Sequence, residues 1–132
     1  MSRWIWRIAL AAHLTLVVSI GAAAYLGALP VHFPRYPHSD LVAHALLVGL
    51  LALFADGALG FRSLFPGRLA LVRLGSTIVL VVAAVEEMAQ GLSPMRSSDI
   101  TDFAADVVGI VVFSTAGWIL HRFVFARPAV SA

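Results

Sequence analysis

Long apolar runs, separated by short polar connections, dominate the chain. The connections are rich in the turn formers Pro, Gly and Ser. A helix rises about 1.5 Å per residue, so an apolar run of about 20 residues can cross a hydrocarbon layer of about 30 Å. The pattern predicts a single all-α domain over 1–132, an integral membrane bundle of four transmembrane helices. These helices are expected at about 4–29, 41–60, 69–92 and 102–125.

The first apolar run also resembles a signal peptide at its start, because two positively charged residues, Arg3 and Arg7, precede it. Its apolar stretch, from Ile8 to Leu29, is longer than the roughly 7–15 residues of a signal-peptide core. We therefore expect a transmembrane helix here.

Composition strengthens the membrane interpretation and removes several kinds of chemistry. Hydrophobic residues make up 61% of the chain and charged residues 12%, which is too apolar for a soluble domain. The chain has no cysteine, which excludes disulfides, thiolate metal sites and cysteine nucleophiles. The basic residues are all arginines, scattered near helix ends without a basic run, so nucleic-acid binding is not expected.

The arginines predict an orientation, because cytoplasmic connections carry an excess of positive charge. The N-terminus, the second connection and the C-terminus hold Arg3, Arg7, Arg62, Arg68, Arg73, Arg122 and Arg127. The first and third connections hold Arg35 and Arg96. This asymmetry predicts that both termini are cytoplasmic, in the inner membrane of a bacterium.

With this orientation, most of the acidic residues gather at the outer ends of the helices. They are Asp40, Glu86, Glu87, Asp99, Asp102 and Asp106. Asp56 lies toward the cytoplasmic end of the second helix, where we expect it to pair with Arg62. Ionisable residues inside a membrane are costly and commonly mark functional positions.

Helical spacing predicts that these polar residues form one outward-facing pocket. Side chains three or four residues apart share a helix face, as His44 does with Asp40 and as Gln90 does with Glu87. The predicted ligand-binding residues are Asp40, His44, Glu87, Gln90, Arg96, Asp102 and Asp106. Arg96 is expected to neutralise the carboxylates. His44, Glu87 and Asp106 are also candidate ligands for a divalent cation, although no complete metal-ligand signature is present.

These positions resemble the VanZ-like family of small bacterial membrane proteins over roughly residues 36–120. The family pattern is Asp-Lys-x-x-His, then E-x-x-Q, then an arginine, then D-x-x-x-N-x-x-G. The matching positions here are Asp40, His44, Glu87, Gln90, Arg96, Asp102 and Gly109. Leu41 replaces the lysine and Asp106 the asparagine, so this pocket is more acidic than the family pattern.

The resemblance implies a cell-envelope function and, for the founding member, an accessory part in resistance to glycopeptide antibiotics, notably teicoplanin. It implies no settled biochemical reaction.

Three classes of function fit the residues. The first is an accessory protein that binds an envelope lipid, a glycan or a lipophilic glycopeptide at the outer leaflet. The second is a membrane-embedded hydrolase or transferase, with Glu87 or Asp102 as general base, His44 as acid or metal ligand, and Arg96 for a phosphate or oxyanion. The third is a structural subunit of a larger membrane complex, in which the charges only lock the helices together.

Overall fold

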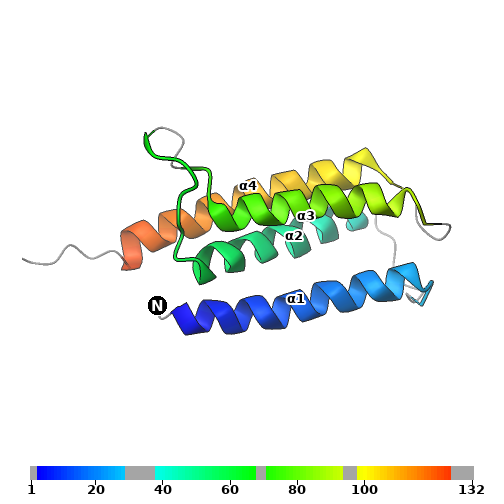
Figure 1. Cartoon of the computed structure of the whole chain (residues 1–132), viewed down its shortest axis with the longest axis horizontal. Helices are drawn as coiled ribbons and strands as arrows, with labels where there is room; N and C mark the ends of the chain where they lie inside the picture. Colours follow the sequence, from blue (N-terminus) through cyan, green and yellow to red (C-terminus); the bar gives the residue numbers. More distant parts are fainter. Residues whose placement is uncertain (1–2, 29–37, 68–70, 94–97, 126–132) are drawn as a thin grey trace, which may run out of the picture.

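The computed structural model describes residues 3–28, 38–67, 71–93 and 98–125. Four α-helices account for most of them, as Figure 1 shows: α1 (Arg3–Tyr25), α2 (Ser39–Ala58), α3 (Leu74–Gln90) and α4 (Ile100–Leu120). A short π-helical turn, η2 (His121–Phe125), continues α4. The prediction of an all-α protein with four helices is confirmed.

Helix lengths differ from the prediction mainly in α1 and α3. α1 ends at Tyr25, and the chain turns at Gly27 with a positive φ of 65°. α3 begins at Leu74, after Arg73, whose extended backbone pairs with Ser63 through an isolated β-bridge.

Three helices are long and apolar enough to cross a membrane, namely α1, α2 and α4 with the first residues of η2. α3 has 17 residues, which corresponds to a rise of about 25 Å.

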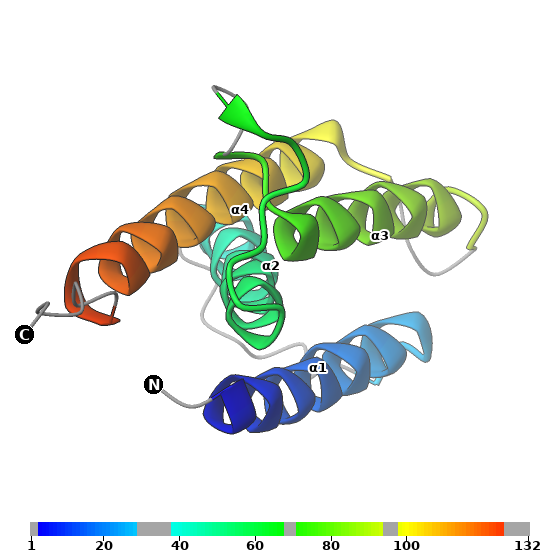
Figure 2. The same cartoon turned by 60° about the vertical axis from the view of Figure 1, so that its left-hand side comes forward.

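α2 lies at the centre of the bundle and packs against the other three helices (Figure 2). Its closest partner is α4, which runs parallel to it. A Cβ atom added to Gly109 would lie 2.1 Å from the carbonyl oxygen of Ala45. Only glycine permits this approach, and small residues have this function at many membrane helix interfaces. The indole of Trp6 likewise packs where a Cβ atom of Gly57 would lie, so α1 and α2 are in close contact.

The alternating directions of the helices give the bundle two ends of different charge. One end, hereafter the arginine end, contains the starts of α1 and α3 and the ends of α2 and α4 (Figure 1). All arginines of the described residues lie there, namely Arg3, Arg7, Arg62, Arg73 and Arg122. The opposite end, hereafter the acidic end, holds Asp40, Glu86, Glu87, Asp99, Asp102 and Asp106.

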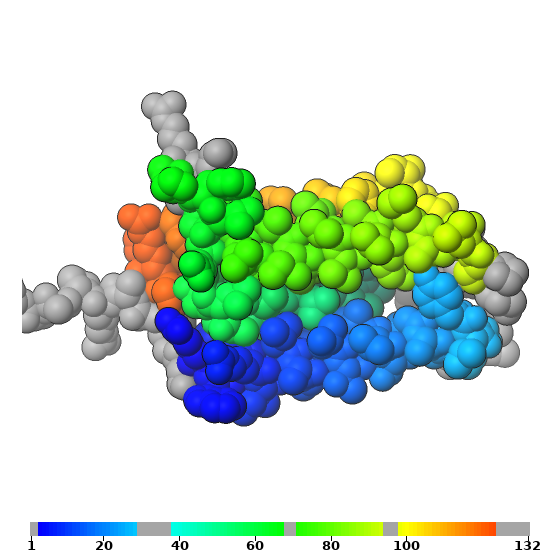
Figure 3. Space-filling model, in the orientation of Figure 1, coloured from blue at the N-terminus to red at the C-terminus, as the bar shows by residue number. Residues whose placement is uncertain are grey.

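The flank between the two ends is apolar. In Figure 3, α3 covers the face above α1. Val81, Val82 and Val85 of α3 are exposed. The buried apolar core is small, and its central cluster consists of Leu51, Ala52, Ala55, Val79 and Ile110. A flank of exposed aliphatic side chains is suited to contact with lipid.

Candidate functional site

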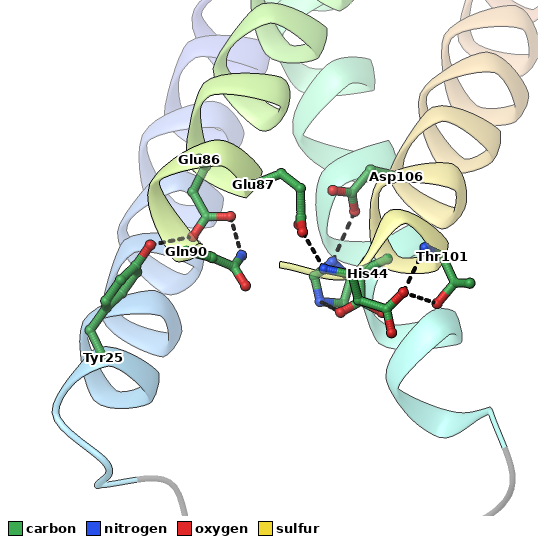
Figure 4. A network of polar contacts seen from close by, with 9 residues as sticks. Tyr25, His44, Glu86, Glu87, Gln90, Thr101 and Asp106 are labelled. Carbon is green, nitrogen blue, oxygen red and sulfur yellow. Dashed lines mark hydrogen bonds and ion pairs between the residues drawn. The ribbon is translucent and has the colours of Figure 1, made fainter. Parts of the chain in front are cut away.

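His44 is the centre of a polar cluster at the acidic end (Figure 4). Its Nδ1 lies 3.1 Å from Oδ1 of Asp106, and its Nε2 lies 3.7 Å from Oδ2 of Asp102. Asp102 and Asp106 are four residues apart on α4, so both carboxylates face the imidazole from one side of that helix. An ionised carboxylate can only accept, so His44 donates Nδ1–H to Asp106 in that state. The two acids therefore set the orientation of the imidazole ring.

Burial within the cluster decreases toward the end of the bundle. The exposed fraction of the side chain is 7% for Asp106, 19% for Asp102 and 25% for His44. Asp106 is thus the most deeply buried of the three, while His44 and Asp102 are partly exposed at the surface of the protein. A ligand arriving at the acidic end would therefore reach His44 and Asp102 before Asp106.

Glu87 connects α3 to the beginning of α4. Its side chain is buried, and Oε1 accepts the backbone N–H of Asp99 at 2.5 Å. Asp99 is the N-cap of α4, where Oδ1 accepts from the backbone N–H of Thr101 at 2.9 Å and from its hydroxyl at 2.7 Å. These hydrogen bonds hold the pKa of the Asp99 carboxyl below its usual value, and the one from the backbone N–H of Thr101 has the larger effect. Asp99 therefore caps the helix, as Ser, Thr, Asp and Asn commonly do.

Gln90 and Glu86 extend the polar cluster from α3 to α1. Gln90 is almost completely buried, and its Nε2 donates to Oε2 of Glu86. The other oxygen of Glu86 accepts from the Tyr25 hydroxyl at 3.2 Å, as Figure 4 shows. Tyr25 and Glu86 were not among the predicted site residues. Glu86 could have been found, since it lies four residues before Gln90, whereas Tyr25 is 61 residues from Glu86 in the sequence.

Most of the predicted site residues come together at the acidic end. His44, Asp102 and Asp106 are in direct contact, and Glu87 and Gln90 line the same end from α3. Asp40 is exposed one turn before His44 and lies near enough to Asp102 for an electrostatic interaction. Arg96, the expected counter-charge, lies outside the described residues.

The candidate metal ligands do not form a metal site. Within the described part of the chain, no three His, Cys, Asp or Glu side chains could hold a metal ion together. Glu87 bonds to the backbone of Asp99, while His44 pairs with the acids of α4. The proposed set of His44, Glu87 and Asp106 therefore receives no support from the geometry.

A second polar cluster, which the sequence did not predict, lies toward the arginine end. Asp56 is completely buried, and its Oδ1 accepts the backbone N–H of Ser76 at 2.9 Å. Its Oδ2 accepts from the hydroxyls of Ser76 and Ser114, the latter at 2.6 Å. Arg62 is exposed, so the expected pairing of Asp56 with Arg62 is wrong. Gly75 lets α3 come this close, because a Cβ there would lie 2.5 Å from the backbone nitrogen of Asp56.

Arg73 lies near enough to Asp56 for an electrostatic interaction. It is buried at the start of α3, and Nη1 donates to the carbonyl oxygen of Phe61 at 2.9 Å. Its guanidinium carbon lies 4.9 Å from the centre of the Trp118 ring. Burial lowers the pKa of Arg73, and the charge of Asp56 opposes that shift. The cluster joins α2, α3 and α4 and has no open side, so we assign it to stability.

Comparisons with protein-family models, curated proteins and solved structures find no match for this chain. The structure itself defines the class of protein. It is an all-helical protein in which three helices could span a membrane, which indicates contact with lipid.

Proposed function

We propose that this chain is a VanZ-like accessory protein of the bacterial cell envelope. In this proposal the acidic end binds an envelope lipid, a glycan or a lipophilic glycopeptide antibiotic such as teicoplanin. The observation that carries it is the position of His44, held at 3.1 Å from Asp106 and 3.7 Å from Asp102 between otherwise apolar helices. Ionisable groups at such a position are commonly functional.

The chemistry of the cluster favours a ligand with hydrogen-bond donors or positive charge. Asp40, Asp99 and Asp102 are at least partly exposed and offer carboxylate oxygens, which accept hydrogen bonds from hydroxyl and ammonium groups. Sugars and glycopeptides carry many such groups. The aliphatic part of a lipophilic ligand would lie along the exposed apolar flank, in the lipid.

We propose further that all four helices span the bacterial cytoplasmic membrane, with both termini in the cytoplasm. The location of the described arginines at one end supports this orientation. The rise of α3, about 25 Å, is a few ångströms less than the hydrocarbon layer. A bilayer accommodates a short helix by local thinning at modest cost.

Direct binding tests this function, with teicoplanin as the probe and the full chain in lipid nanodiscs. His44→Gln should weaken binding roughly tenfold to a hundredfold, because it removes the imidazole and its hydrogen bond to a carboxylate. His13→Gln is the matched control, since His13 lies in α1, away from the cluster, with Nε2 2.8 Å from the carbonyl oxygen of Leu47. In cells, the same His44 variant should change susceptibility to teicoplanin.

Two results would contradict the proposal. One is wild-type affinity in His44→Gln, and the other is an equal loss in His13→Gln, which would indicate a general loss of structure.

The pairing of His44 with two carboxylates also favours a second candidate function, a hydrolase or transferase. A histidine oriented by one carboxylate and close to another is suited to general acid–base catalysis. In an enzyme, His44→Gln would abolish turnover of an envelope lipid while the lipid still binds. Equal loss of binding and turnover would favour the accessory function instead.

A further inference from the structure

Phe61 joins all four helices at the arginine end. It lies shortly after the end of α2 at Ala58, and its ring centre lies 5.7 Å from that of Trp6 in α1 and 4.7 Å from that of His121 at the end of α4. Its carbonyl oxygen accepts from Arg73 at the start of α3. The backbone of Phe61 has a φ of 53°, which is uncommon for an aromatic residue. These contacts hold the residue in that conformation.

Three exposed arginines lie next to this junction. The guanidinium of Arg3 is beside Gly60, where an added Cβ would lie 3.6 Å from its Nε. Arg62 is the residue after Phe61, and Arg122 is the residue after His121. Arg122 stacks against Trp118, with its guanidinium carbon 5.3 Å from the ring centre. The three positive charges thus come from α1, from the connection after α2, and from the end of α4.

Among the described residues, no Asp or Glu side chain is placed to neutralise these three arginines. Asp56 is the one acidic residue outside the acidic end, and it is completely buried. Its carboxylate oxygens already accept from Ser76 and Ser114. The exposed arginines therefore give this end of the bundle a net positive surface.

We propose that Arg3, Arg62 and Arg122 bind the phosphate of an anionic phospholipid around Phe61. The planar guanidinium fork matches phosphate oxygens, and each arginine near a bilayer surface strengthens attraction to anionic lipid roughly fivefold. The exposed Trp4 at the same end is suited to the level of the lipid head groups. The inference rests on membrane insertion of the helices and not on the ligand of the acidic end.

Native mass spectrometry of the full chain tests this proposal. The protein is taken from nanodiscs that contain phosphatidylcholine alone or phosphatidylcholine with phosphatidylglycerol. We expect phosphatidylglycerol to be retained in preference to phosphatidylcholine. Arg3→Gln, Arg62→Gln and Arg122→Gln should each reduce that preference roughly fivefold.

Arg7→Gln is the matched control. Arg7 lies at the same end, one turn after Arg3 on α1, but its guanidinium carbon lies 5.7 Å from the Trp4 ring and not beside Gly60 or next to Phe61 and His121. An equal loss in Arg7→Gln would show a diffuse surface charge and overturn the local site. Equal retention of the two lipids would also overturn it.

A third arm of the experiment adds inorganic phosphate to the detergent-solubilised protein. If phosphate alone raises the melting temperature as much as phosphatidylglycerol does, the ligand is a free anion and the lipid assignment is wrong.

Discussion

At the scale of single residues, the two buried acids of the helix interiors have different partners and different functions. Asp106 faces His44 in a cluster that is partly open, whereas Asp56 has all of its oxygens turned toward Ser76 and Ser114. In a partly exposed cluster, a side chain can replace one of its hydrogen-bond partners with a ligand. A completely buried cluster has no room for a ligand. This is why the proposed binding site lies at Asp106 and its neighbours, and why Asp56 is assigned to stability.

Asp56→Ala should lower the free energy of unfolding by about 3–5 kcal/mol, because the buried donors of Ser76 and Ser114 lose their acceptor, at about 1–3 kcal/mol for each donor left unsatisfied. Thermal or denaturant unfolding in detergent micelles measures this change. Arg62→Ala is the control and should change stability by less than about 0.5 kcal/mol, since Arg62 is exposed. A comparable loss in both variants would restore the pairing of Asp56 with Arg62 that the structure contradicts.

At the scale of the helices, the separation of α2 and α4 controls the geometry of the acidic end. His44 belongs to α2 and its two carboxylate partners belong to α4, so any increase in this separation lengthens both contacts. Gly109 and Gly49 allow the close approach, because each would clash with the partner helix if it carried a Cβ.

Gly109→Ala should therefore destabilise the protein by about 1–3 kcal/mol through overpacking against Ala45. It should also weaken binding at His44, whose contacts with α4 would lengthen. Gly21→Ala in α1 is the matched control. Its Cβ would meet nothing within 4 Å, and alanine favours the helix by about 1 kcal/mol over glycine. Unfolding of the two variants in detergent gives the comparison, and equal stability of Gly109→Ala and the wild type would disprove tight packing at this contact.

At the scale of the whole molecule, charge separates along the bundle. The acidic end has six carboxyl groups and the arginine end has all the arginines of the described residues. Such an asymmetry orients a membrane protein, because the arginines remain on the cytoplasmic side.

Labelling of single cysteines tests the proposed orientation, and the absence of native cysteine makes each reporter unique. Ser39→Cys lies at the start of α2 and should react with a membrane-impermeant maleimide added to intact cells. Leu64→Cys lies in the connection before α3 and should react only after permeabilisation. The reverse pattern would place both termini outside, and reaction of both sites in intact cells would mean that α2 does not cross the membrane.

Much of the fold followed from the sequence because lipid imposes a simple requirement. The long apolar runs had to be helices, since a helix satisfies its own backbone hydrogen bonds without water. The polar residues at the predicted outer helix ends then had to meet, because α2 and α4 begin, and α3 ends, at the same level. This is why the grouping of His44 with Asp102 and Asp106 could be predicted before any contact was known.

Tertiary structure alone decided which sides of the helices face each other. A membrane helix is apolar on every side, so its sequence does not mark an inward face as an amphipathic soluble helix does. The sequence therefore did not indicate that Ser76 and Ser114 contact Asp56, or that Tyr25 donates a hydrogen bond to Glu86. These contacts depend on how each helix is rotated about its axis. Close packing sets that rotation, at Gly75 against Asp56 and at Gly109 against Ala45, through steric fit between residues far apart in the sequence.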